Sequence, residues 1–256
     1  MQTIKLTKKD FKQSDSYWKD YIGAEIEFGA DVNIEIEANL GYVRFDRLNV
    51  KGHIIAEAGT GIKAGEGIEA GEGIEAGMGI EAGWGIEAGW GIEAGEGIKA
   101  GMGIKAGMGI KAGTGIKAGW GIEAGEGIEA GEGIKAGMGI KAGWGIKAGE
   151  GIEAGMGIEA GEGIKAGMGI KAGLSITCKL TLKAAYKVFA GICYWRKQVD
   201  DQDKTITCGK FEGGEIEYGI LKETGLSDNS DTKSESLSGK TVKLVIDGKE
   251  HEAIIK

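Results

Sequence analysis

A six-residue unit, G-I-[E/K]-A-G-x, occurs nineteen times without a gap between residues 61 and 174. A fixed short period of this kind is typical of a solenoid, in which each repeat contacts only its neighbours. The collagen triple helix is excluded, because it needs glycine at every third position and this unit has glycine at its first and fifth. A flexible glycine linker is the more serious alternative, but linkers do not place isoleucine at every sixth residue.

The unit predicts short strands joined by tight turns. Residues two apart in an extended segment face the same way, so isoleucine and alanine share one face and the Glu/Lys between them takes the other. We therefore expect the aliphatic side chains inside and the charges outside. The glycines that flank x suit turns, and we expect them to use positive φ where one flat wall meets the next.

Degenerate copies extend the pattern toward the N-terminus. The segment "IEFGAD" aligns with the perfect unit, and "VNIEIE" and "ANLGYV" follow it in the same phase. In this alignment the second inward position holds Phe28, Ile34 and Leu40, which are large enough to indicate a core. The stretch "IGAEIEFGADVN" resembles the [LIV]-G-x-x-x-x hexapeptide of left-handed parallel β-helices, although the perfect units carry glycine at two other positions.

The number of units in one coil follows from side chains that would stack on each other. Glu/Lys positions have opposite charge in eleven of sixteen pairs eighteen residues apart, eleven of seventeen pairs twelve apart, and six of eighteen pairs six apart. Opposite charges on neighbouring strands are favourable, so eighteen and twelve both remain open. At position x, only a spacing of eighteen sorts apolar residues into one column. The sequence thus predicts an all-β fold, a three-sided parallel β-helix (β-solenoid) with 18 residues per coil.

Position x accepts tryptophan, methionine, threonine and glutamate, so it must lie on an outer corner and not in a packed interior. One corner would then carry an exposed apolar stripe, and such stripes usually contact something. Either the chain's own C-terminal region covers it, or a protein partner or second protomer does. We predict a protein-binding surface formed by Trp84, Met102, Trp120, Met138 and Met156, with Trp90 and Trp144 on the neighbouring corner.

The flanking segments predict caps, which protect the exposed edges of a solenoid. We expect an N-terminal cap over 1–25, in which "YWKDY" suits a short helix, followed by the solenoid over 26–174. A C-terminal β module should occupy 175–223. Residues 224–239 are rich in Ser, Asp, Thr and Lys and predict a linker. Residues 240–256 predict a β-hairpin around Asp247-Gly248.

Catalytic chemistry finds little support. The chain has two histidines, His53 and His251, far apart in sequence, so a histidine-based acid/base pair is not indicated. A hexapeptide-repeat acyltransferase, which uses a histidine between coils, is the weakest of the functional alternatives. The three cysteines show no zinc or redox spacing. We expect no enzyme activity, no cofactor and no metal.

Charge and hydropathy narrow the partners. The net charge is −8. Ten glutamates balance ten lysines in the middle position, counted from Glu57, and seven more glutamates occupy x, so a basic face for nucleic acid is not expected. No run of 18 apolar residues and no signal peptide is visible, so we expect no membrane contact and a cytoplasmic location.

The G-I-[E/K]-A-G units and the following "SITC" also resemble uncharacterised repeat proteins carried by phages and mobile elements of Firmicutes. This resemblance implies a bacterial host cell and raises the expectation of anti-defence work such as anti-CRISPR inhibition. We expect a non-enzymatic protein-binding solenoid that inhibits a nucleic-acid-handling or defence enzyme. The alternative is a structural, self-assembling fibre or spike element.

Overall fold

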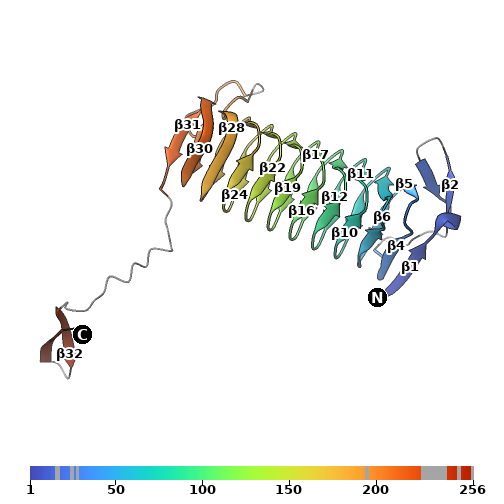
Figure 1. Ribbon diagram of the computed structural model, residues 1–256, viewed down its shortest axis with the longest axis horizontal. Coiled ribbons are helices and arrows are strands. Elements are labelled where there is room, and N and C mark those ends of the chain that lie inside the picture. The colour runs from blue at the N-terminus through green and yellow to red at the C-terminus, as the bar shows by residue number, and fades with distance from the viewer. Residues whose placement is uncertain are drawn as a thin grey trace. The chain divides into compact units, whose positions relative to one another are not determined.

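The computed structural model describes residues 1–14, 18–23, 26, 29–193, 196–225, 241–246 and 249–254. The chain divides into two units, Met1–Gly225 and Leu226–Lys256. The first unit is a stack of parallel strands around a common interior (Figure 1). Its only helix among the described residues is the 3-10 turn η1 (Lys8–Asp10). None of the described helices is long and apolar enough to cross a membrane.

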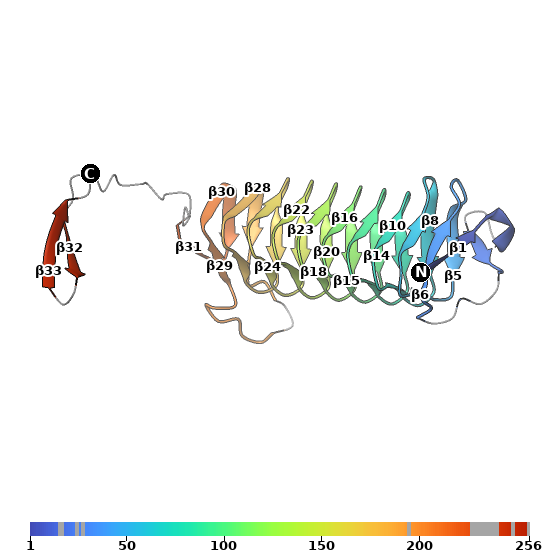
Figure 2. The ribbon, with the colours of Figure 1, turned by 90° about the horizontal axis from the view of Figure 1, so that it is seen from below.

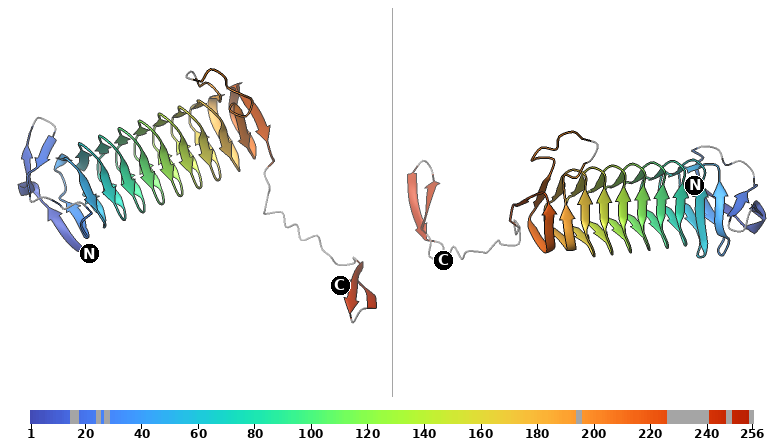
Figure 3. Two further views of the ribbon diagram at one scale, coloured as in Figure 1. Left: turned by 180° about the vertical axis from the view of Figure 1, so that it is seen from behind. Right: turned by 90° about the horizontal axis from the view of Figure 1, so that it is seen from above.

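The strand pairings arrange the first unit as three walls of parallel strands. The stacked strands can be followed from below, behind and above (Figures 2 and 3). Wall 1 stacks β1 (Gln2–Leu6), β4 (Val32–Ile36), β7 (Ile54–Ala56), β10 (Ile74–Ala76), β13 (Ile92–Ala94), β16 (Ile110–Ala112), β19 (Ile128–Ala130), β22 (Ile146–Ala148) and β25 (Ile164–Ala166). Wall 2 stacks β5 (Gly41–Phe45), β8 (Thr60–Ala64), β11 (Ile80–Ala82), β14 (Ile98–Ala100), β17 (Ile116–Ala118), β20 (Ile134–Ala136), β23 (Ile152–Ala154) and β26 (Ile170–Ala172). Wall 3 stacks β6 (Leu48–Val50), β9 (Ile68–Ala70), β12 (Ile86–Ala88), β15 (Ile104–Ala106), β18 (Ile122–Ala124), β21 (Ile140–Ala142), β24 (Ile158–Ala160), β27 (Ile176–Cys178), β29 (Thr205–Cys208) and β31 (Ile220–Glu223).

The register confirms a coil of eighteen residues in the perfect repeats. Ile110 pairs with Ile128, Lys111 with Glu129 and Ala112 with Ala130. Every third strand therefore neighbours in space, which gives three walls and excludes the two-sided alternative. The corners are hydrogen-bonded as well, since the Trp120 amide donates to the Met102 carbonyl at 3.1 Å.

The interior is built from the two inward positions, as the alternation predicts. Each isoleucine of the perfect repeat is about 1% exposed or less and each alanine 3% or less, while the Glu/Lys between them faces outward. Stacked isoleucines form a continuous column on each wall. Burial of each isoleucine side chain stabilises the fold by about 1.5–3 kcal/mol relative to exposure.

The expected role of the repeat glycines is wrong. Among the described residues, positive φ occurs at Asn39 and at seven glycines, all outside residues 61–174. Glycine is needed for close approach instead. A Cβ on Gly143 would lie far inside van der Waals contact with the Gly125 carbonyl oxygen one coil away. The second glycine of each unit meets the same obstacle from Gly83 to Gly149 and again at Gly161, Gly167 and Gly173. After the perfect repeat, Ala185 stands where the second glycine of a unit would be. Its amide donates to the Met168 carbonyl, which lies two residues further along the chain than the acceptor that the repeat glycines use.

The N-terminal coils are longer than the perfect ones. Ile34 pairs with Ile54 and Ile54 with Ile74, each twenty residues apart, and Val43 pairs with Ile62, nineteen apart. The extra residues form turns that include positive φ at Asn39 (60°). Ile34 therefore lies in the first inward position, so the phase expected from the alignment is wrong. Leu40 is buried outside a strand, and Phe28 lies outside the described residues.

The N-terminal cap is a β-hairpin and not a helix. The first strand, β1, already stacks on β4 in wall 1. The described residues between β1 and β4 then leave wall 1, and β2 (Phe11–Gln13) pairs antiparallel with β3 (Trp18–Tyr21), which contains most of the "YWKDY" motif. Strand β3 joins the edge of wall 2 beside β5. Phe11 packs edge-on against Phe45 at 5.8 Å, so the cap shares the core.

The segment after the repeat continues the walls instead of forming a separate module. β28 (Thr181–Phe189) follows wall 1 and then wall 2, pairing first with β25 and then with β26. β30 (Lys210–Tyr218) lies beside it along both walls, with a bend at Gly213 (φ 92°). Between β28 and β29, the described residues 190–193 and 196–204 contain no strand and belong to a loop that extends away from the stack (Figure 2).

The second unit contains an antiparallel hairpin of β32 (Thr241–Ile246) and β33 (Lys249–Ile254), as the alternating pattern predicts. Its expected turn, Asp247-Gly248, and most of the expected linker lie outside the described residues.

Candidate protein-binding surface

Position x generates three corners with different chemistry, and each follows one column of eighteen-residue spacing. The apolar corner, between walls 2 and 3, carries Glu66, Trp84, Met102, Trp120, Met138, Met156 and Leu174. The mixed corner, between walls 3 and 1, carries Glu72, Trp90, Met108, Glu126, Trp144, Glu162 and Leu180. The acidic corner, between walls 1 and 2, carries Met78, Glu96, Thr114, Glu132, Glu150 and Met168.

The apolar corner is accessible along most of its length. Trp84 is 51% exposed and Trp120 58%, and Met102 and Met138 between and beyond them are also exposed. Met156 and Leu174 are only half-buried. Neighbouring members lie one strand spacing apart, about 4.8 Å, so the stripe from Trp84 to Leu174 spans about 24 Å. The predicted surface residues on this corner therefore form one continuous row.

Two polar features mark the ends of this row. At the N-terminal end Arg47 forms an ion pair with Glu66, and its guanidinium carbon lies 5.9 Å from the centre of the Trp84 ring. At the other end, the Gly191 amide at the start of the loop between β28 and β29 donates to the Leu174 carbonyl at 3.0 Å. This loop therefore contacts the last residue of the row. It does not cover Trp84 and Trp120, which are exposed within the unit Met1–Gly225.

A groove of about 910 Å³ follows wall 3 beside the apolar corner. Its apolar side is formed by Met102, Trp120 and Met138, and its other side by the outward Glu/Lys row of wall 3. The floor contains glycine backbone, because the first glycine of each unit has no side chain. A partner segment placed here would meet aromatic and thioether surface on one side and alternating charges on the other.

Trp90 and Trp144, the secondary candidates, lie on the mixed corner and are also exposed. They are three coils apart, with Met108 and Glu126 between them. His53 stands at the head of this column, where its Nε2 lies 2.6 Å from Glu72 and its ring packs edge-on against Trp90 at 5.2 Å. The Gly73 amide donates to His53 Nδ1 at 3.2 Å. Both ring nitrogens are therefore engaged within the chain.

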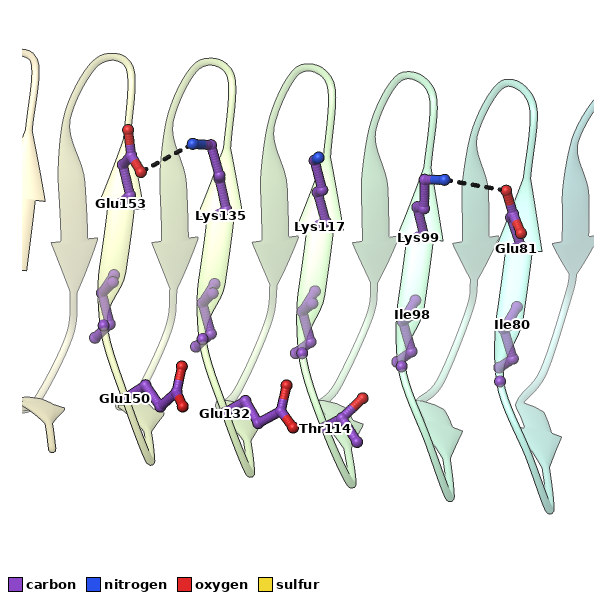
Figure 4. A pocket seen from close by; sticks show the side chains of 18 of the residues that line it. Ile80, Glu81, Ile98, Lys99, Thr114, Lys117, Glu132, Lys135, Glu150 and Glu153 are labelled. Atoms are coloured by element: carbon purple, nitrogen blue, oxygen red, sulfur yellow. Dashed lines mark hydrogen bonds and ion pairs between the residues drawn. The ribbon is translucent and has the colours of Figure 1, made fainter. Parts of the chain in front are cut away.

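The acidic corner and the adjacent outer face of wall 2 enclose a groove of about 850 Å³ (Figure 4). Glu132 and Glu150 lie on one side beside Thr114. Tyr42 lies at the N-terminal end of the groove and donates to Glu96 at 2.6 Å. Burial, together with this hydrogen bond, raises the pKa of Tyr42 to about 12.

Outward charges on the walls pair with the next coil, as the charge counts predict. Of the eleven stacked pairs with opposite charge in the perfect repeat, eight are ion pairs, including Lys99–Glu81 at 3.2 Å and Lys135–Glu153 at 2.9 Å (Figure 4). The hydrogen bond from Lys135 lowers the pKa of Glu153. Each exposed pair is worth at most about 1 kcal/mol. The charge left over after pairing is concentrated in the corner glutamates.

The arrangement offers binding surface more than reactive groups. Cys178, Cys193 and Cys208 are buried free thiols, and burial raises the pKa of Cys178 to about 12. Among the described residues no three His, Cys, Asp or Glu side chains gather where they could hold a metal ion.

The sequence did not predict two residues that contact the corners. Arg47 lies beside Trp84, and Tyr42 lies beside Glu96. Both belong to the long N-terminal coils, where an eighteen-residue spacing does not locate neighbours. No protein-family model, curated protein or solved structure matches the chain.

Proposed function

We propose that the chain is a non-enzymatic protein-binding β-solenoid whose apolar corner docks onto a partner protein. The observation that supports this best is the sorting of exposed apolar side chains. Trp84, Met102, Trp120 and Met138 occupy consecutive coils of one corner, although glutamate is accommodated at the same position on the other two. Because these side chains project outward, they add little to the packing of the repeat.

The size and chemistry of the row suit a protein interface. Tryptophan and methionine are enriched at such interfaces, and tryptophan is a frequent hot spot. The rigid stack of coils holds the anchors at fixed spacing, so little conformational freedom is lost on binding. Arg47 and the wall 3 charges would form a polar rim around this apolar centre.

We further propose that the partner is a nucleic-acid-handling or defence enzyme of a bacterial host and that binding inhibits it in the cytoplasm. Support comes from the resemblance to phage and mobile-element repeat proteins and from the acidic corner. Glu132 and Glu150 on adjacent coils face a groove and have no ion pair among the described residues. Such carboxylates can compete for a basic nucleic-acid channel.

The fibre or spike alternative requires end-to-end stacking of solenoids. The N-terminal edge of wall 2 is occupied by β3, which is parallel to β5, and the strand outside it, β2, runs in the opposite direction to the walls. This cap weighs against indefinite stacking through that end.

The proposal is tested by affinity capture from host lysate, mass spectrometry and then binding measurements with the purified partner. Trp84→Glu with Trp120→Glu should weaken binding by at least about 2 kcal/mol per anchor. Met78→Glu with Met168→Glu on the acidic corner is the matched control, and it should not weaken binding. All four positions lie outside the core, so the melting temperature should stay close to that of the parent. Equal loss of affinity in both variants would contradict a role specific to the apolar corner.

A further inference from the structure

The outer face of wall 1 carries an ordered gradient of charge. On six consecutive coils of the perfect repeat its outward residues are, in order, Glu75, Glu93, Lys111, Glu129, Lys147 and Lys165. One end of the row is therefore acidic and the other basic. The row covers five coil intervals, or about 24 Å at about 4.8 Å each.

Ion pairs within the chain use the middle of this row and leave its ends. Lys111 pairs with Glu93 at 2.7 Å, and Lys147 pairs with Glu129 at 2.5 Å. Among the described residues Glu75 and Lys165 have no ion pair, and each is exposed. Lys165 is stacked between two further lysines, Lys147 and Lys183, which is unfavourable within one chain.

We propose that wall 1 is the interface of an antiparallel dimer of this chain, with the two-fold axis at the level between Lys111 and Glu129. In this register Glu75 faces Lys165 of the second copy, Glu93 faces its Lys147, and Lys111 faces its Glu129. Symmetry doubles these three pairs, so all six contacts join opposite charges. The two charges that are unpaired within one chain become partners across the interface.

Other arrangements of the same surface are electrostatically worse. Parallel solenoids in register would put every charge of wall 1 against itself. Moving the antiparallel axis to the level of Glu129 would place Glu129 against Glu129 and Lys111 against Lys147. On wall 2 the consecutive lysines Lys99, Lys117 and Lys135 prevent any antiparallel register in which three facing pairs all join opposite charges. On wall 3 no antiparallel register gives more than two facing pairs of opposite charge.

The edges of the interface contribute opposing effects. Along the mixed corner the register brings Trp90 to the level of Trp144 of the second copy, twice by symmetry, beside a groove of about 680 Å³ on wall 1. Along the acidic corner it brings Glu96 to the level of Glu150. This repulsion lies at an exposed rim, where salt screens it.

The face predicts a weak, reversible dimer. A wall of six residues per coil is at most about 20 Å wide, so about 480 Å² per copy would be covered, below the range of stable interfaces. The apolar corner joins walls 2 and 3 and lies opposite wall 1. The dimer would leave both apolar corners free, so this inference stands independently of the proposed function.

Sedimentation velocity of the full chain from low to high micromolar concentration tests the dimer. We expect reversible association, weakened about tenfold by Glu75→Lys and likewise by Lys165→Glu, because each change turns two attractive contacts repulsive. The double variant Glu75→Lys/Lys165→Glu exchanges the partners and should restore the parent affinity. Lys117→Glu on wall 2 is the control and should have no effect.

Three results would overturn the proposal. They are a monomer at every concentration, a dimer that neither single variant weakens, or a double variant that remains as weak as the singles. Because the substituted side chains are exposed, circular dichroism melting should be unchanged and separates lost association from lost folding.

Discussion

The two glycines of one repeat unit should respond in opposite ways to alanine. Gly139 and Gly143 flank the same strand, β21, and neither has positive φ. A Cβ on Gly139 would lie 3.5 Å from the Gly157 carbonyl oxygen, an ordinary contact, and Ser175 occupies the equivalent position in a later coil. A Cβ on Gly143 would instead collide with the Gly125 carbonyl.

The magnitudes follow from these surroundings. Gly139→Ala should stabilise by up to about 0.4–1 kcal/mol, because alanine restricts the unfolded chain without straining the folded one. Gly143→Ala must push two coils apart. That shift strains the hydrogen bonds that the Gly143 amide donates to the Ala124 carbonyl (3.1 Å) and the Trp144 amide donates to the Glu126 carbonyl (3.0 Å). Losing both costs about 1–3 kcal/mol and overpacking a further 1–3, so we expect destabilisation of about 2–6 kcal/mol.

Urea denaturation followed by far-ultraviolet circular dichroism would measure the difference between the variants. Because solenoid coils can unfold in parts, the midpoints should be compared at matched slopes. Equal midpoints for Gly139→Ala and Gly143→Ala would refute the reasoning, since both substitutions change chain entropy equally and differ only in the space available.

Three further outcomes are expected. Ile110→Asp should bury an unpaired charge and lower the melting temperature sharply, whereas Lys111→Asp on the outward face should change it little; equal melting would show that the isoleucines are not core. Cys178 should resist thiol reagents near pH 8 until the chain is unfolded, because its pKa of about 12 keeps the thiol protonated, and rapid labelling of the folded chain would contradict that burial. Replacing His53 and His251 together by glutamine should leave partner capture intact, and its loss in a folded variant would reopen the acyltransferase alternative.

The regular part of the fold was predictable because two side chains of each unit vary, the Glu/Lys and the residue at position x. Sorting at position x and charge alternation at the middle position are both consequences of stacking. The charge alternation left coils of twelve and eighteen residues open, and the sorting at position x then favoured eighteen. The same reasoning placed Trp84 and Trp120 on one corner. It assigned the glycines the wrong role, because a carbonyl one coil away is a tertiary neighbour that local turn preferences do not reveal.

The ends of the solenoid were less predictable. The extra residues in the N-terminal coils moved Ile34 from the second inward position to the first, and no spacing in the sequence marks those turns as insertions. Trp18 and its neighbours form a strand because the edge of wall 2 offers them a partner. Similarly, β28 follows two walls because its corner position holds Ala185 and not glycine.

The most direct test of the three-walled coil is excimer fluorescence from pyrene pairs attached to cysteines in a variant whose three native cysteines are replaced by alanine. The account predicts strong excimer emission for labels at Thr114 and Glu132, eighteen residues apart, where the Glu132 amide donates to the Thr114 carbonyl at 3.0 Å. Labels at Thr114 and Glu126, twelve apart and on different corners, should give monomer emission, with excess unlabelled protein suppressing contacts between molecules. Excimer emission from the twelve-residue pair and none from the eighteen-residue pair would contradict the three-walled structure.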